Sequence, residues 1–112
     1  MRVPEIDLAR AQRFCAARVP ARLAGQLRLE VEVDGVAVTI VERRAPWSPE
    51  VGPEWSRLPV ASLRYSPKHG AWSLFWFDRD NAAHHYPGAP PTPTVADLLR
   101  LVDEDPTGVF WG

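Results

Sequence analysis

The residues whose types could support chemistry gather between positions 42 and 57 of this 112-residue chain. This short stretch holds three acids, three arginines and two tryptophans, and six of these eight residues are candidates: Glu42, Arg43, Arg44, Trp47, Trp55 and Arg57. A pocket for an anionic group needs aromatic walls and a guanidinium, and this segment supplies both residue types. These six residues are therefore the candidate binding residues, with Trp47 and Trp55 as the walls of a pocket and Arg43 or Arg57 as the residue that binds the anionic group of a ligand.

The same segment also has a purely structural interpretation. Strand alternation places Glu42 and Arg44 on the apolar face of the preceding strand, and Arg43 on the opposite face. A carboxylate and a guanidinium on the core side must pair, because an unpaired buried charge is costly. Glu42 and Arg44 would then form an ion pair at the rim of the sheet, which holds the tryptophan loop over the open end of the core.

Metal and catalytic sites find little support in the sequence. Glu42-x-Arg44 is similar to the acidic-x-Lys element of divalent-metal nucleases, but no second acid is expected on the same face. His84 and His85 are adjacent, so on a strand they point to opposite faces, and no CxxC or HExxH spacing occurs. We predict no catalytic residue, no metal and no cofactor. An enzyme with a pocket at Glu42, Arg44 and the tryptophan loop remains the weaker alternative.

The outer face of the predicted sheet is a second candidate surface. Aromatic side chains beside arginine on a sheet can stack nucleic-acid bases, and a basic helix adds phosphate contacts. The residues that would do this are Arg10, Arg13, Arg64, Phe75, Phe77 and His85. The competing interpretation is that one of the helices or a dimer partner covers the two phenylalanine rings, which we favour for a sheet this apolar on both sides.

Charge is distributed unevenly although the net charge is only −1. Residues 1–28 carry six arginines against two acids, whereas residues 94–112 carry four acids against one arginine. The simplest interpretation is that two helices of opposite charge attract each other within one fold. A basic face that binds a partner is the alternative.

Two hairpins supply most of the predicted sheet. Asp34-Gly35 between alternating runs is the strongest short-range hairpin signature, and it pairs Val33 with Val36. That register puts six branched residues on one buried face: Leu29, Val31, Val33, Val36, Val38 and Ile40. In the second hairpin, the pairing of Tyr65 with Trp72 places Trp72, Leu74 and Trp76 in the core. A short fifth strand follows through residues 84–86.

Helices are expected at both ends of the chain. Pro4 and two carboxylates begin the first helix, Pro20 bounds it, and Cys15 lies on its apolar stripe. Thr94 and Asp97 form an approximate capping box for the second helix, which a proline ends. The predicted fold class is α+β: an antiparallel β-meander of about five strands flanked by an N-terminal and a C-terminal helix, in a single domain over residues 1–112.

The compartment and the chain end can be predicted from composition. A lone cysteine, no recognisable leader and no apolar run of membrane-spanning length indicate a cytoplasmic protein without a membrane segment. Two of the last three residues are large aromatics, Phe110 and Trp111. We expect this tail to fold back onto the core, close to the Trp47/Trp55 loop.

Several strings rich in uncommon residues occur together from about Leu29 to Gly112. They are Glu42-Arg43-Arg44-x-Pro46-Trp47, Gly52-Pro53-Glu54-Trp55, Pro59-Val60-Ala61, Leu63-Arg64-Tyr65, Trp72-Ser73-Leu74-x-Trp76-x-Asp78-Arg79 and Asp105-Pro106-Thr107-Gly108-x-Phe110-Trp111-Gly112. In these strings the chain resembles the bacterial family catalogued as domain of unknown function 3024. The resemblance does not extend to the first helix, and it implies a small stand-alone bacterial domain without assigning an activity.

Two functions from different classes follow from these observations. The first is a non-enzymatic protein-interaction or regulatory module, because tryptophans in a proline-stiffened loop lose little entropy on binding. The second is a nucleic-acid-binding domain that uses the basic first helix and the aromatic sheet face. We expect a protein partner or a second copy of the chain ahead of nucleic acid.

Overall fold

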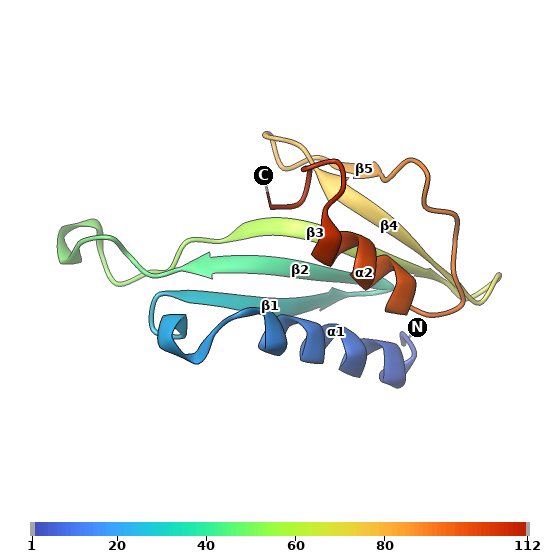
Figure 1. Cartoon of the computed structure of the whole chain (residues 1–112), viewed down its shortest axis with the longest axis horizontal. Coiled ribbons are helices and arrows are strands. Elements are labelled where there is room, and N and C mark those ends of the chain that lie inside the picture. Colours follow the sequence, from blue (N-terminus) through green and yellow to red (C-terminus); the bar gives the residue numbers. More distant parts are fainter. Residues whose placement is uncertain (1, 112) are drawn as a thin grey trace.

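The computed structural model describes residues 2–111 and contains two helices and one sheet. The elements in chain order are α1 (Glu5–Arg18), β1 (Leu27–Asp34), β2 (Ala37–Arg44), β3 (Leu58–Ser66), β4 (Ala71–Phe77), β5 (Ala83–His85) and α2 (Ala96–Glu104). The strands pair antiparallel in the order β1-β2-β3-β4-β5 (Figure 1). The predicted α+β meander between two helices is therefore confirmed.

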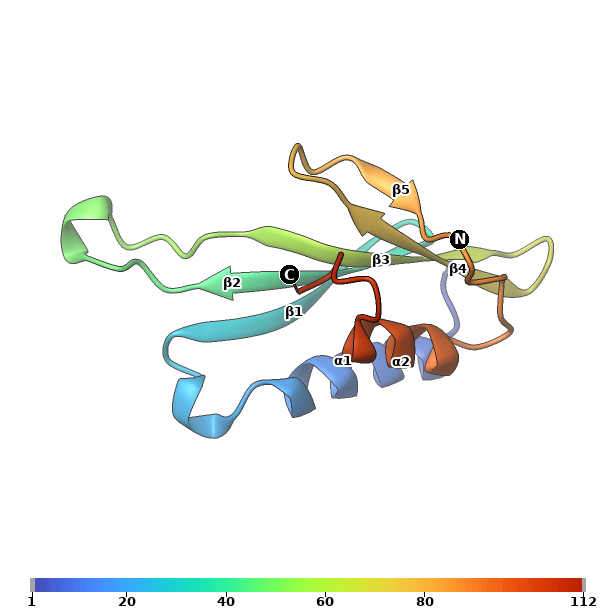
Figure 2. The same cartoon turned by 45° about the horizontal axis from the view of Figure 1, so that its top comes forward.

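Both helices lie on the same side of the sheet, and α1 runs alongside the edge strand β1 (Figures 1 and 2). Between the helices and the sheet lies one continuous apolar core, whose fully buried members include Ala11, Ile40, Leu63, Trp72, Leu74, Leu98 and Val102. Cys15 belongs to this core as expected. Among residues 2–111 no helix covers the opposite face of the sheet.

The first hairpin keeps its predicted faces but not its predicted register. Asp34 pairs with Ala37 and Val33 with Val38, so every pair is shifted by two residues from the expected one. Gly35 has a φ of 59° and takes the first turn position, which favours glycine. Because a shift of two preserves side-chain alternation, the six branched residues still share a face. Val33 is nevertheless half exposed, since it lies at the end of an edge strand.

The second hairpin has the predicted register. Tyr65 pairs with Trp72, and Ala61 pairs with Trp76. Trp72 is fully buried, whereas Trp76 is only partly buried and stacks on His84 with ring centroids 4.8 Å apart. The prediction that Trp76 is core was therefore too strong, because this residue lies near the end of β4 beside the short edge strand.

A buried carboxylate connects α1 to the rest of the fold. Asp7 is 3% exposed and accepts hydrogen bonds from the indole Nε1 of Trp72 at 3.2 Å and from the backbone N of Val95 at 3.0 Å. Arg10 Nη1 donates a third hydrogen bond at 3.3 Å. One side chain therefore joins α1, β4 and the start of α2.

The predicted capping box of α2 is only half present. Thr94 Oγ1 accepts from the backbone N of Ala96 at 3.3 Å, but Asp97 pairs with Arg100 and does not return to the cap. Asp7, which lies on the other helix, accepts from the backbone N of Val95 at the start of α2. The start of α2 thus depends on a residue that lies 88 positions earlier in the sequence.

The C-terminal tail folds back onto the core, as predicted. The Asp105 carboxylate accepts from the backbone N atoms of Phe110 and Trp111 at 3.1 and 2.9 Å. Phe110 is buried and stacks on Tyr86, and Trp111 Nε1 donates to the Val102 carbonyl at 2.6 Å. The tail contacts α2 and Tyr86, so its expected position close to the Trp47/Trp55 loop was wrong.

Candidate functional site

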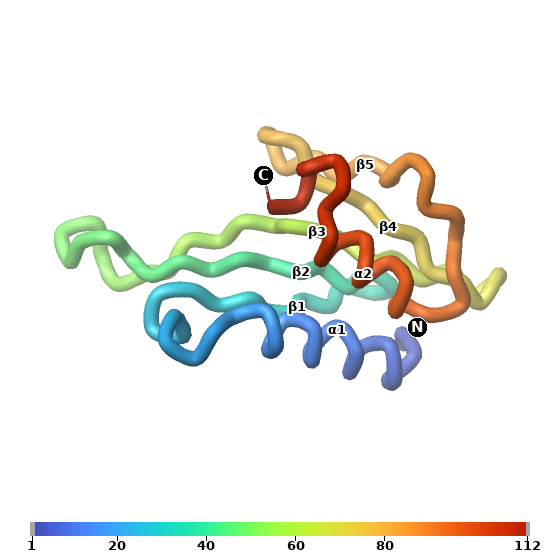
Figure 3. Tube along the Cα trace, in the orientation of Figure 1, coloured from blue at the N-terminus to red at the C-terminus, as the bar shows by residue number. Residues whose placement is uncertain are grey.

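The Glu42–Arg44 ion pair predicted at the rim of the sheet is present. Arg44 Nε lies 2.7 Å from Glu42 Oε1, and the Glu42 side chain is only 15% exposed. The loop that follows does not close over the core, however. It projects beyond the end of the sheet (Figure 3), and Trp47 is 83% exposed. The interpretation of this loop as a core lid is therefore wrong for Trp47.

Backbone pairing beyond β2 and β3 explains why the loop projects. Ala45 N donates to the Gln26 carbonyl and Ser56 N donates to the Arg44 carbonyl, both at 2.9 Å. These bonds continue the strands past the region that the helices cover. At the far end a short 3-10 turn, Pro49–Val51, is capped by Ser48, whose Oγ accepts from Glu50 N. Residues 46–56 are called the loop tip below.

A groove of about 980 Å³ lies at the base of the loop tip. Its walls come from the loop, from the end of β2 and from the segment before β1: Leu23, Gln26, Leu27, Arg44, Ala45, Pro46, Trp47, Val51, Glu54, Trp55 and Ser56. Of the six candidate binding residues, the structure brings Arg44, Trp47 and Trp55 together here. Glu42 takes part only through its ion pair with Arg44.

Arg43 and Arg57 belong to the opposite, helix-free face. Arg43 Nε lies 3.2 Å from Glu30 Oε2, and its Nη2 lies 3.4 Å from Glu32 Oε2. Arg57 Nε donates to the same Glu32 carboxylate at 3.0 Å. Both guanidinium groups are thus held by carboxylates of β1 and do not line the groove. The six candidate binding residues are therefore divided between the groove and the helix-free face.

Sequence reasoning missed Arg28, which lies over the Trp55 ring with its guanidinium carbon 4.2 Å from the ring centroid. The register carries the signal for it, because Arg28 is paired with Arg43 and so shares the helix-free face. Val41 is fully buried on that face although no helix of the described chain covers it. Long arginine and glutamate side chains that lie flat across a sheet can cover apolar surface in this way.

The aromatic part of the same face is covered by its own neighbours. The Arg64 guanidinium carbon lies 4.2 Å from the Phe75 ring centroid, and His85 meets that ring edge-on at 5.6 Å. Arg64 Nε also donates to Ser62 Oγ at 3.3 Å. Of the expected covers for Phe75 and Phe77, a helix is wrong, because both helices lie on the other side of the sheet. Cover by a dimer partner stays a prediction.

The predicted nucleic-acid residues do not form one surface. Arg64, Phe75, Phe77 and His85 share the helix-free face, as the register predicts. Arg10 and Arg13 lie on α1, which packs against the opposite face, and Arg10 is bonded to the buried Asp7. A ligand would have to pass around the edge of the sheet to touch both groups.

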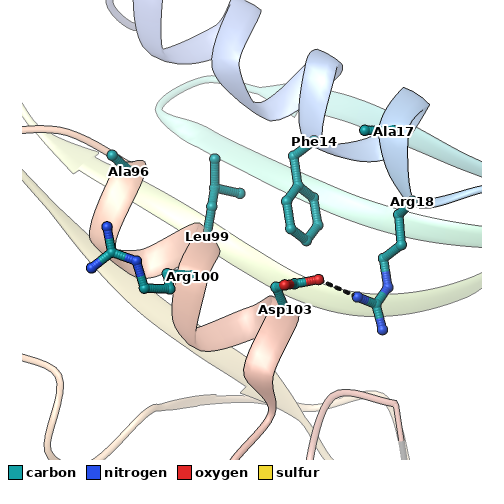
Figure 4. A pocket seen from close by; sticks show the side chains of 7 residues that line it. All are labelled: Phe14, Ala17, Arg18, Ala96, Leu99, Arg100 and Asp103. Carbon is teal, nitrogen blue, oxygen red and sulfur yellow. Dashed lines mark hydrogen bonds and ion pairs between the residues drawn. The ribbon is translucent and has the colours of Figure 1, made fainter.

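A second hollow, of about 360 Å³, lies between α1 and α2 (Figure 4). Phe14 and Leu99 face each other across it, and an ion pair between Arg18 and Asp103 joins the two helices at one side. Arg18 also lies over the Trp111 ring, 4.0 Å from its centroid. The expected attraction between a basic first helix and an acidic second helix is therefore realised by a specific contact.

Residues 2–111 contain neither a candidate metal cluster nor a membrane-spanning helix. No group of three or more histidine, cysteine, aspartate or glutamate side chains in this range could hold a metal ion. No helix in this range is both long enough and apolar enough to cross a membrane. His84 and His85 point to opposite faces as predicted: His84 Nε2 lies 2.7 Å from Asp78 Oδ2, whereas His85 contacts Phe75.

The sequence matches the family described as Domain of unknown function (DUF3024) over residues 2–112. The chain belongs to this family. The match extends through α1, beyond the resemblance that began near Leu29, and the contacts of Asp7 show why α1 is an integral part of the DUF3024 fold in this chain. No curated protein and no solved structure matches the sequence.

Two carboxyl groups of this DUF3024 chain have lowered pKa values. A hydrogen bond from Arg57 holds the pKa of Glu32 below its usual value, with the charges of Arg57 and Arg43 adding to the effect. A hydrogen bond from His84 and one from the backbone N of Ala82 lower the pKa of Asp78. A carboxyl whose pKa is lowered by folding stabilises the protein above its unfolded pKa, near 4, and loses that contribution as the pH falls through its folded pKa.

Replacing Glu32 with glutamine is therefore expected to make stability less dependent on pH in acid. Denaturant unfolding at several values between about pH 5 and pH 2 should show a shallower loss for Glu32→Gln than for the wild type. Glu54→Gln is the control, because Glu54 forms no ion pair within residues 2–111. Equal slopes for Glu32→Gln and the wild type would contradict the role given to the Glu32–Arg57 pair.

Proposed function

We propose that this chain is a non-enzymatic protein-interaction module that binds a protein partner through the loop tip. The observation that carries the proposal is the 83% exposure of Trp47 on a segment that projects from the fold. Val51 in the same tip and the nearby Leu58 are each 51% exposed. Large apolar side chains grouped at a projecting end are typical of protein-binding surfaces.

The stiffness of the loop tip supports the same function. Three prolines, Pro46, Pro49 and Pro53, restrict its backbone, and the Ser48 cap fixes the turn between them. Ordering a flexible loop on binding costs conformational entropy, so a loop that is already stiff keeps more of its contact energy. Tryptophan is also the residue type most enriched among those that dominate interface energies.

An enzymatic function receives less support from the titratable groups. The pKa values of Glu32 and Asp78 are shifted downward, whereas a general acid at neutral pH needs an upward shift. Burial raises the pKa of the Cys15 thiol to about 11, which keeps it protonated and poorly nucleophilic. These are properties of structural groups.

Nucleic-acid binding is the second candidate, and the geometry favours it less. Base stacking needs bare aromatic rings, but Arg64 and His85 already contact Phe75. The arginines Arg43 and Arg57 of the same face are already paired with Glu30 and Glu32, which leaves their guanidinium groups less available to phosphate. The basic residues of α1 belong to another surface.

The test is a binding comparison between the wild type and two alanine variants of exposed apolar residues. Trp47→Ala removes the proposed contact, and Ile6→Ala removes a 61% exposed side chain on α1. Each immobilised protein is exposed to lysate of its own cell, and captured proteins and nucleic acids are identified. We expect a defined protein that Ile6→Ala retains and Trp47→Ala loses. Equal capture by all three proteins, or capture of nucleic acid that only Arg64→Ala abolishes, would overturn the proposal.

A further inference from the structure

We infer that the loop tip binds a second copy of this chain, with Trp47 of each protomer seated in the groove of its partner about a two-fold axis. The inference rests on the proposed function, since it names a partner for the same loop tip. A second copy is the inferred partner because the loop tip combines an exposed tryptophan with a groove that can receive one.

The shape of the loop tip fits a symmetric contact. A two-fold contact uses the same patch on both protomers, so that patch must be complementary to itself. Trp47 is 83% exposed and forms one wall of the groove of about 980 Å³, whose other walls include Leu23, Leu27, Val51 and Trp55. A projecting aromatic next to a partly apolar hollow meets this requirement, because each side chain finds the hollow of the other protomer.

The charged residues around the loop tip also fit a symmetric contact. Glu50 and Glu54 belong to the loop tip, and Arg22 adjoins Leu23 at the groove wall. All three are exposed, and none of them forms an ion pair within residues 2–111. The groove wall carries both Arg44 and Glu54, and a two-fold axis brings Glu50 at the tip of one protomer toward Arg22 beside the groove of the other. The patch is thus complementary to itself in charge as well as in shape.

The loop tip is accessible to a second copy of the chain. The loop tip lies at one end of a molecule that is 48 Å long, while the β3–β4 turn lies at the other end and the β1–β2 turn lies toward it (Figure 2). No other element of the described chain stands in front of the loop tip (Figures 1 and 3). A second copy can therefore approach it without rearrangement of either protomer.

The size of the contact sets the expected affinity. Two buried tryptophans account for roughly 300–500 Å², against roughly 1,200–2,000 Å² in a standard interface. The groove walls and Leu58 must supply the remainder, so we expect a modest dimer that dissociates in the micromolar range.

Sedimentation equilibrium of the full chain tests the association itself. Across concentrations from about one micromolar to about one millimolar, we expect a monomer–dimer equilibrium. Trp47→Ala should raise the dissociation constant on the order of 30-fold or more, as for other central tryptophans, whereas Ile6→Ala should leave it unchanged. Association that Trp47→Ala leaves intact would overturn the inference, and so would a monomer at every concentration.

Energy transfer between labelled protomers tests where they meet. Because Cys15 is buried and burial raises its thiol pKa to about 11, a cysteine introduced at the surface is the one that reacts with maleimide dyes. Donor- and acceptor-labelled Ala24→Cys proteins, which carry the dye on an exposed residue next to the groove wall, should show strong transfer when mixed. Asp34→Cys proteins, labelled in the β1–β2 turn away from the loop tip, should show little. The reverse result would place the contact on another surface and overturn the inference.

The outcomes for the inference and for the proposed function are separate. A chain that stays monomeric yet loses a lysate partner on Trp47→Ala contradicts self-association and supports the proposed function. If energy transfer is strong between the Asp34-labelled proteins, and if the Trp47→Ala variant still captures every lysate partner, then both the inference and the proposed function are contradicted.

Discussion

Replacing Asp7 with alanine is expected to lower the free energy of unfolding by about 3–5 kcal/mol, the cost typical of removing one partner from a buried charged network. The substitution leaves the indole N–H of Trp72 and the backbone N–H of Val95 buried without their acceptor. A buried donor that has lost its partner cannot regain a hydrogen bond to water, so the loss exceeds that of an exposed hydrogen bond. Urea unfolding followed by circular dichroism measures it.

A double-mutant cycle separates the Asp7–Trp72 contact from the other roles of Asp7. Trp72→Phe removes the indole donor together with part of the buried ring, and Asp7→Asn keeps one acceptor oxygen. The cycle cancels the packing loss, because that loss is the same with and without the Asp7 substitution. We expect a coupling energy of about 1 kcal/mol or more between the two positions. A loss below about 1 kcal/mol for Asp7→Ala would show that the buried carboxylate does not hold α1 to the fold.

Deleting residues 109–112 is expected to lower the free energy of unfolding by about 4 kcal/mol, as for other losses of a buried aromatic side chain. Phe110 is 7% exposed and stacks on Tyr86 with ring centroids 5.3 Å apart. The deletion also leaves the Asp105 carboxylate and the Val102 carbonyl without their donors. Thermal and denaturant unfolding of the truncated chain measure the effect.

Point variants show which part of the tail matters. Phe110→Ala should account for most of the loss, because Phe110 is buried and Trp111 is only partly so. Trp111→Phe should cost less, since it removes only the indole hydrogen bond to Val102. A truncated chain that keeps wild-type stability but loses association would contradict the account and would make the tail a binding element.

Alternation along the strands predicted the sheet well and its exact pairing less well. Side chains repeat with a period of two, so the pattern through Val31, Val38 and Ile40 identified a shared face. The same period makes a shift of two residues invisible, which is why the turn moved from Asp34-Gly35 to Gly35-Val36 without any change of face. In the second hairpin the residues expected in the loop allowed only one register, and the structure has that register.

Burial was harder to predict because it depends on what lies above each face. Phe75 and Phe77 make the outer face of β4 as apolar as its inner face, so the sequence pattern could not say which face the helices cover. Asp7 escaped notice for a different reason. A carboxylate in the first turn of a helix is ordinarily explained by the helix dipole, and its partners Trp72 and Val95 are distant in sequence.

The candidate site was predicted in its residues and not in its shape. The Glu42–Arg44 pair follows from alternation and the cost of buried charge, and it is present. The direction of the loop depends on where strand pairing stops. The hydrogen bond from the Ala45 N to the Gln26 carbonyl extends that pairing past the core. The division between groove and helix-free face depends on Glu30 and Glu32, whose partners Arg43 and Arg57 could not be assigned before the register was known.

The most direct test of the proposed binding surface is the stability of the Trp47→Ala monomer. The measurement is denaturant unfolding at a protein concentration well below that of self-association, so that dimer formation does not add to the apparent stability. Because Trp47 is 83% exposed and lies outside the core, the free energy of unfolding should change by less than about 0.5 kcal/mol. A loss of more than about 2 kcal/mol would contradict the account, since it would make Trp47 part of the protein's own core.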